Sequence, residues 1–226
     1  MKKLFPEQVF DILEVGKTGF IVVYRRPEVE DSVVVSYKSV SLENGVVSKR
    51  TRADYEFIKF GEKRKAINLQ VDNFVTCNCV QLENDRLFVV SSNGESKILD
   101  HEGDVEWQGK IRYKENGPSG IANFGHTLWA SFAENNALIR FNLNTMREEL
   151  RIGGSNDSSF MGPEGLWIDE EQGKLIVCNS GANNLLEVNM KTYTVAEKAT
   201  FDEPVHKYLK IGTREFVVLD SGLYLL

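Results

Sequence analysis

Short apolar runs separated by polar turns recur along the chain. Between Gly162 and Met190, an apolar run ends in the turn DEEQG, and a β-branched run, KLIVC, follows it. A turn rich in Ser, Gly and Asn leads to the alternating run NLLEVNM, and a more polar run over residues 192–201 closes the unit. Short runs bounded by Gly, Asn and Asp predict β-strands, and no long window shows the period of a helix. Each unit therefore predicts four strands within an all-β fold.

This four-strand unit repeats at intervals of about 41 to 47 residues, which is the range of β-propeller repeats. The run at 175–177 falls on 128–130 when it is shifted back, and on 216–218 when it is shifted forward. Four of the five prolines lie at the same point of the unit: Pro6, Pro118, Pro163 and Pro204. A sandwich of two sheets gives no reason for this spacing, whereas four strands in about 45 residues is the pattern of a propeller blade. Residues 1–226 are therefore expected to form one domain, a five-bladed β-propeller.

The expected blades span residues 6–72, 73–116, 117–161, 162–202 and 203–226. The last blade is short by one strand, and residues 1–5, which include Leu4 and Phe5, form an apolar run outside the first copy. We expect this N-terminal strand to complete the last blade and close the ring, because closure removes exposed sheet edges. The first copy is too long, and its extra residues are expected in an outer hairpin at 31–54 and a basic tail after it.

The fourth copy resembles the NHL repeat, whose pattern is Pro-x-Gly, an apolar strand, Asp, a Gly turn, a second strand and then Asp-x-Gly-Asn-x-Arg. The matching residues are Pro163, Gly165, Asp169, Gly173, Ser180, Gly181 and Asn183. Asn179 stands in place of the family's Asp, and Leu185 in place of its Arg. The resemblance implies a propeller related to interaction scaffolds, to a streptogramin lyase and to the calcium-dependent, gluconolactonase-type lactonases. A fold of this kind does not by itself select among those functions.

The charge of the chain argues against nucleic acid as a partner. The formal net charge is −6 and the isoelectric point is about 5.3, so a broad basic surface is not expected. The one basic cluster, from Lys59 to Lys65, is interpreted as a solvated edge or hairpin. No run reaches the roughly 20 apolar residues of a membrane helix, so a membrane is not an expected partner either.

The cysteines bear on the compartment. Cys77, Cys79 and Cys178 are an odd number without Cys-x-x-Cys spacing, which predicts reduced, mostly buried thiols and a cytoplasmic protein. Pro6 and Asp11 interrupt the apolar stretch that a signal peptide needs, so none is expected.

A metal site at the central channel is the catalytic hypothesis that the resemblance raises. Glu164, Asn179 and Asp220 are the nearest oxygen ligands for Ca²⁺ or another divalent cation, which would polarise a lactone carbonyl. His206 is the candidate general base for lyase chemistry. Glu164 and His206 begin inner strands and the other two end the following strands, so all four are expected near one face of the disc. The structural alternative is that Asn179 and Asp220 bond the backbone of their own Ser-Gly turns.

Ligand binding without catalysis is the favoured function. Tyr24, Arg25 and Phe132 also follow second strands, where exposed side chains would suit a ligand at the channel mouth. Of these equivalent strand ends, only Asn179 and Asp220 are good oxygen ligands. We therefore expect a non-catalytic binding or scaffold protein without a cofactor, which holds a protein or small molecule with the channel mouth and the inter-blade loops. The alternative is a divalent-metal-dependent hydrolase, of the lactonase kind, or a lyase.

Overall fold

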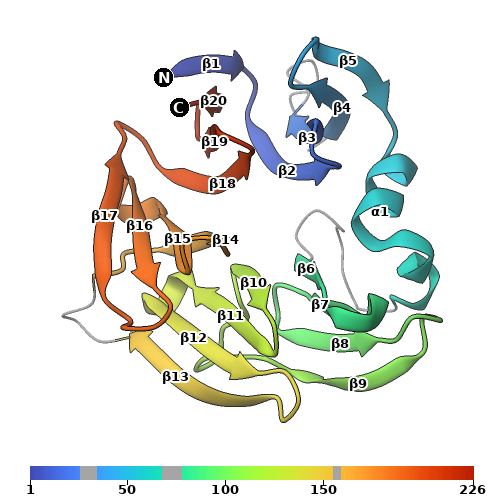
Figure 1. Cartoon of the computed structure of the whole chain (residues 1–226), viewed down its shortest axis with the longest axis vertical. Helices are drawn as coiled ribbons and strands as arrows, with labels where there is room; N and C mark the ends of the chain where they lie inside the picture. The colour runs from blue at the N-terminus through green and yellow to red at the C-terminus, as the bar shows by residue number, and fades with distance from the viewer. Residues whose placement is uncertain (26–34, 68–77, 155–158) are drawn as a thin grey trace.

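The computed structural model of the chain describes residues 1–25, 35–67, 78–154 and 159–226. It contains five antiparallel sheets of four strands each, which stand as blades around a ring (Figure 1). The expected all-β, five-bladed β-propeller is therefore confirmed.

In the first four blades, the strands run in chain order from the ring axis outward. The first blade is β2 (Val9–Val15), β3 (Gly19–Arg25), β4 (Val35–Ser41) and β5 (Gly45–Arg50); the second is β6 (Asn78–Gln81), β7 (Leu87–Val90), β8 (Glu95–Leu99) and β9 (Val105–Lys110). The third is β10 (Gly120–Phe124), β11 (Thr127–Phe132), β12 (Ala137–Asn142) and β13 (Arg147–Gly153); the fourth is β14 (Pro163–Asp169), β15 (Lys174–Asn179), β16 (Asn184–Asn189) and β17 (Val195–Thr200). The fifth is β18 (Val205–Ile211), β19 (Arg214–Leu219), β20 (Gly222–Leu225) and β1 (Lys2–Phe5).

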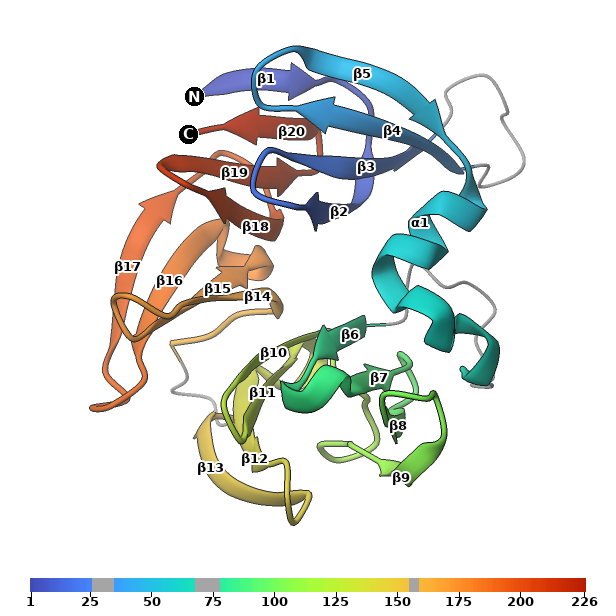
Figure 2. The same ribbon diagram turned by 45° about the vertical axis from the view of Figure 1, so that its right-hand side comes forward.

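The N-terminal strand closes the ring, as expected. Strand β1 pairs antiparallel with β20, so that Lys2 lies opposite Leu225 and Phe5 lies opposite Leu223. Figure 2 shows the two chain ends side by side at this blade. The Phe5 side chain is 3% exposed and packs in the core between the fifth and first blades. Closure therefore both removes a sheet edge and buries an aromatic ring.

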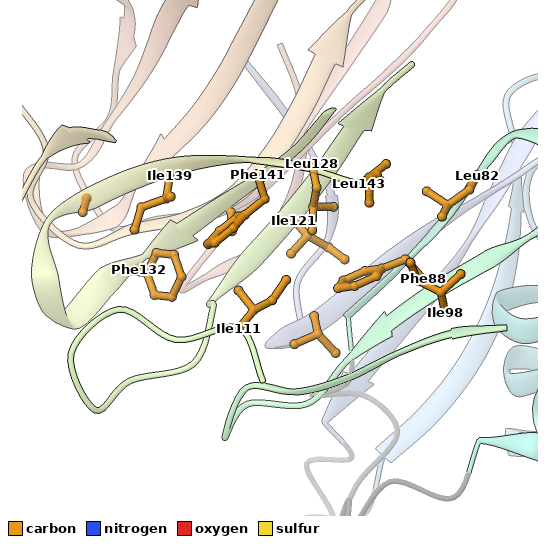
Figure 3. Packing of buried hydrophobic residues seen from close by; sticks show 13 residues of the cluster. Leu82, Phe88, Ile98, Ile111, Ile121, Leu128, Phe132, Ile139, Phe141 and Leu143 are labelled. Carbon is orange, nitrogen blue, oxygen red and sulfur yellow. The ribbon is translucent and has the colours of Figure 1, made fainter. Parts of the chain in front are cut away.

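The second strand of each blade has a continuous apolar sequence because both of its faces are covered, by a neighbouring blade or, between the first and second blades, by a helical segment. All four residues of β7, Leu87 to Val90, are fully buried. A short continuous apolar run is the sequence pattern of such a doubly covered strand. Figure 3 shows the core between the second and third blades, where Phe88 and Ile98 meet Ile121.

A helix lies between the first and second blades, and it was not expected. Helix α1 (Arg52–Phe60) buries Tyr55 beside Tyr37 of the first blade, and Phe60 beside Leu87 of the second. At the four other interfaces, residues of the two neighbouring blades form a shared hydrophobic core. Helix α1 thus acts as a wedge between two blades, as the view in Figure 2 shows.

The expected outer hairpin at 31–54 is present over residues 35–50, where β4 pairs with β5, and the expectation was wrong only at its C-terminal end. The hairpin of β4 and β5 ends at Arg50, residues 31–34 lie outside the described part, and α1 begins at Arg52. The start of the helix is fixed by a capping box, in which Asp54 N donates to Thr51 Oγ1 at 3.2 Å and Thr51 N donates to Asp54 Oδ2 at 2.7 Å. The helix has only nine residues, too few to produce a helical period in a long window of the sequence. A helix of this length depends on packing for its stability.

The basic cluster after the hairpin is not a solvated edge at the positions described. Lys59 and Lys63 are only 8% and 9% exposed. The Lys63 ammonium lies 3.3 Å from the carboxylate of Asp85, in the 3₁₀ helix η2 (Glu83–Asp85) of the second blade. The basic segment thus continues the wedge through the 3₁₀ helix η1 (Gly61–Ala66) and attaches it to the second blade.

Two of the cysteines fall in the described part of the chain. Cys79 is half-buried and Cys178 is buried, whereas Cys77 lies outside the described residues. Within the described ranges, no helix is long and apolar enough to cross a membrane.

Candidate functional site

The imidazole of His206 is held between the carboxylates of Glu164 and Asp220. Nδ1 of His206 lies 2.8 Å from Glu164 Oε2, and Nε2 lies 2.7 Å from Asp220 Oδ1. The second oxygen of Glu164 accepts a hydrogen bond from Ser180 Oγ at 2.9 Å. The side chains of His206, Glu164 and Asp220 are 30%, 35% and 55% exposed. We call these three residues the His206 cluster, and solvent reaches each of them.

Two neighbouring blades bring the cluster together at one face of the disc. Glu164 and His206 are each the second residue of an inner strand, β14 and β18, and Asp220 follows the last residue of β19. In an antiparallel pair the start of one strand lies beside the end of the next. Val205 accordingly lies opposite Leu219. The structure thus places these three side chains at the face where the inner strands begin.

Close contact between inner strands makes the cluster possible. A Cβ atom on Gly165 would overlap the carbonyl oxygen of His206, and one on Gly120 would overlap that of Glu164. The Ser131 hydroxyl also donates to the Glu164 carbonyl. Glycine at these positions lets neighbouring backbones approach closely. The Pro-x-Gly pattern therefore has a physical function, which is to set the distance between blades near the axis.

The two carboxylates keep His206 charged. The hydrogen bond to Glu164 is the main cause that raises the pKa of His206 to about 9; burial opposes this shift, and Asp220 adds to it. Burial by itself would raise the pKa of Glu164, but its hydrogen bonds to His206 and Ser180 outweigh burial and hold that pKa below the usual range. At neutral pH both ring nitrogens of His206 therefore carry protons, and the ring has no lone pair with which to accept another.

Asn179 is not part of the His206 cluster. Its side chain is buried, and Oδ1 accepts a hydrogen bond from the Met161 backbone N–H at 2.6 Å. Its amide nitrogen donates to Asn184 Oδ1 at 2.8 Å. The three oxygen ligands suggested by the sequence are thus divided between two hydrogen-bond networks. Among the described residues, no group of three or more His, Cys, Asp or Glu side chains is arranged to hold a metal ion.

The aromatic residues expected at the channel mouth are buried instead. Tyr24 is 8% exposed and packs edge-on against Phe5, with ring centroids 4.9 Å apart. Phe132 is fully buried against Tyr113. Only Arg25 is exposed. The expectation of exposed rings was wrong because β3 and β11, as second strands, are covered by neighbouring blades up to their ends.

A buried ionic cluster around Asp11 was missed by the sequence analysis. Asp11 Oδ2 accepts from Tyr55 Oη at 2.5 Å and from Lys59 Nζ at 3.3 Å, and Lys207 Nζ lies 3.5 Å from Oδ1. Burial favours the neutral acid, but Lys207 and Lys59 outweigh it and lower the pKa of Asp11. Burial and the nearby Asp11 charge raise the pKa of Tyr55 well above its usual value. This Asp11 cluster connects β2, α1 and β18.

One signal for the Asp11 cluster was present in the sequence. In VFDILEV, Asp11 stands two residues before Leu13 and so shares its face, which packs against Tyr55, and a buried carboxylate requires partners. Those partners could not be named, because Tyr55 and Lys59 face Asp11 only once residues 52–60 form a helix.

No protein-family model matches the chain, and no curated protein matches it by sequence. Solved structures match its shape. Virginiamycin B lyase from Staphylococcus aureus matches with a TM-score of 0.53 and 11% identity, over 95% of this chain and 64% of that one. A chain of a nidogen/laminin complex matches with a TM-score of 0.55 and 9% identity, over 94% and 72%. Hydrazine synthase from Kuenenia stuttgartiensis matches with a TM-score of 0.52 and 17% identity, over 64% and 42%.

These matches concern the fold alone, because all the identities are low and propellers serve many functions. The match spans less than two thirds of the hydrazine synthase and virginiamycin B lyase chains. By fold, the chain is a five-bladed β-propeller, consistent with the NHL-like pattern of its fourth blade.

Proposed function

We propose that this propeller is a non-catalytic binding module, and that its ligand contacts the His206 cluster through a basic group. The proposal rests on one observation: the imidazolium of His206 holds two carboxylates in place by hydrogen bonds, at an accessible face of the disc. Charges that are held in place by hydrogen bonds lose little freedom when a ligand binds, which favours recognition.

The protonation of His206 favours binding over proton transfer. A general base must accept a proton near the working pH. Because the pKa of His206 is raised to about 9, the ring is an imidazolium at neutral pH and acts as a hydrogen-bond donor. Its two N–H groups are directed at Glu164 and Asp220, so the ring orients the carboxylates.

The charge of the cluster favours a ligand with a basic group. Two carboxylates and one imidazolium leave an excess of negative charge, and Asp220 is the most exposed of the three. Met161, which is 56% exposed, accepts a backbone hydrogen bond from Gly181, next to Ser180 of the same network. The face thus offers an acidic group beside an apolar one, which complements a lysine or arginine side chain with its methylene groups.

The match to a propeller of similar shape in a nidogen/laminin complex supports a protein as the source of that side chain. A small cationic molecule would satisfy the same chemistry. The first experiment therefore tests whether the ligand must carry a positive charge.

Proton NMR of the imidazole rings gives a readout at the site itself. The chain has three histidines, and His101 and His126 are exposed on turns, so they serve as internal controls. We expect argininamide to shift the His206 resonance without shifting the other two, and N-acetylglutamate to shift none. Asp220→Asn should weaken the argininamide response, whereas Asp104→Asn, at an exposed turn, should not. Equal shifts from both probes, or none from argininamide, would overturn the proposal.

The alternative is a divalent-metal-dependent hydrolase or lyase, and it makes a different prediction. A cation bound by Glu164 and Asp220 would have to displace the imidazolium from both carboxylates. Thermal melts with calcium and with a chelator test this, because a ligand of the native state raises the melting temperature by mass action. A calcium-dependent rise that is lost in Glu164→Gln would favour the metal-dependent enzyme.

A further inference from the structure

A cavity of about 390 Å³ lies between the fifth and first blades, away from the His206 cluster. Most of its lining is apolar and includes Val40, Leu42, Phe216 and Leu225. The remaining side chains include Lys2, Arg214, Glu43 and Ser41. Volume and composition are those of a small-molecule pocket, in which an apolar wall surrounds a few polar groups.

The length of the strands accounts for this cavity. The outer strands of the fifth blade, β1 and β20, have four residues each, whereas β4 and β5 of the first blade have seven and six. Because the shorter strands do not cover the full length of the longer ones, Val40 and Leu42 of the first blade are only half-buried at one end. Figure 2 shows β1 and β20 beside β4 and β5.

The cavity opens on the face opposite to the His206 cluster. His206 lies at the start of β18, while Arg214 begins the antiparallel strand β19 at the far end of β18. Leu42 likewise follows the last residue of β4. The two sites therefore lie at opposite ends of the strands, and a ligand of one does not contact the other.

Two cationic side chains of the lining, Arg214 and Lys2, determine which charge a ligand should carry. Arg214 Nη1 donates to the Leu42 carbonyl at 2.5 Å, which fixes the guanidinium across the gap between the blades. Among the described residues, neither Arg214 nor Lys2 forms a salt bridge, and Glu43 is the acidic residue of the lining. A guanidinium has five N–H donors, so donors remain for a carboxylate.

We propose that this cavity binds a small amphipathic carboxylate. The apolar body of the ligand would lie against the half-buried side chains of Val40, Leu42 and Leu225. Its carboxylate would accept charge-assisted hydrogen bonds from Arg214, with Lys2 adding positive charge. Nothing in this site depends on the proposed function of the opposite face.

Isothermal titration with decanoate, and with decanol as the uncharged probe of the same length, tests the proposal. Arg214→Gln should weaken decanoate binding about tenfold, the factor expected for one charge-assisted hydrogen bond at an exposed rim, and should leave decanol binding unchanged. Arg112→Gln is the matched control, because Arg112 is also exposed and also donates to a backbone carbonyl, that of Asn93. It should bind decanoate as the unmodified protein does.

A substitution that fills the cavity with a larger side chain tests the binding site independently of the charge. Leu225→Trp, near the C-terminus, should reduce the binding of both probes, with folding checked by the thermal melt. The proposal is overturned if decanoate does not bind, if Arg214→Gln and Arg112→Gln bind it equally, or if Leu225→Trp folds and binds both probes normally.

Discussion

A Cβ atom on Gly165 would overlap the carbonyl oxygen of His206, so the inner strands of two blades are closer there than any other residue permits. This contact positions the carboxylate of Glu164, the residue before Gly165, against the imidazole of the next blade. The spacing of the blades and the geometry of the His206 cluster therefore depend on the same backbone contact.

Gly165→Ala should separate the two strands. We expect a loss of about 1–3 kcal/mol in the free energy of unfolding, the usual cost of overpacking, together with a lower pKa of His206, because the ring moves away from Glu164. Urea unfolding and NMR titration measure the two effects. Gly212→Ala, at a turn with a φ of 61° and open space around the Cβ, should lose stability without changing the His206 pKa.

The raised pKa of His206 makes stability depend on pH. Because the folded-state pKa, about 9, lies above the unfolded value of about 6.5, this contribution is fully present below pH 6.5 and is lost as the pH rises through 9. The loss is at most about 3 kcal/mol, and less after allowance for solvent screening of a partly exposed group. Unfolding measured from pH 6 to pH 10 should show the decline, and His206→Gln should flatten it. An unchanged slope in that variant would contradict the assignment.

Asn179 should act as a structural residue. Asn179→Ala removes the acceptor of the Met161 N–H and the donor to Asn184, and a buried group left without its partner costs about 1–3 kcal/mol. Urea unfolding measures this, with Asn144→Ala, at an exposed turn, as the control. If Asn179→Ala were as stable as the control, the buried network would have no structural importance.

Deletion of residues 1–5 should destabilise the whole ring. The deletion removes β1, exposes the edge of β20 and empties the space of the Phe5 ring. Loss of the ring alone should cost about 3–5 kcal/mol. A lower melting temperature and a greater tendency to aggregate are expected, whereas Lys3→Ala, which keeps the strand, should melt almost like the unmodified protein.

The Asp11 cluster should hold the helical wedge in place. Asp11→Ala leaves Lys59 and Lys207 without their shared carboxylate, and breaking a buried ion pair on one side costs about 3–5 kcal/mol. Hydrogen exchange should show faster exchange of the α1 amides in this variant. The triple variant Asp11→Ala, Lys59→Met and Lys207→Met also removes the two positive charges. It should recover part of the free energy of unfolding that Asp11→Ala loses.

Much of the fold could be predicted because it depends on local patterns. The alternation in VFDILEV, the continuous apolar run LFVV of β7 and the recurring prolines are each readable within a few residues. Helix α1 was missed for the converse reason. Its nine residues carry only a capping box as a local signal, and Tyr55 and Phe60 stabilise it through the two blades between which they lie.

The candidate functional site was also predictable from the sequence only in part. The sequence alone determined that Glu164, His206 and Asp220 belong to inner-strand starts and second-strand ends, since the repeat fixes their place in each blade. Only the tertiary structure decided that one imidazole bonds both carboxylates, from residues 42 and 14 positions away, while Asn179 turns inward and Tyr24 and Phe132 are covered. The physical reason is that a repeat specifies the path of the backbone, whereas the direction and partners of a side chain depend on how closely the next blade approaches.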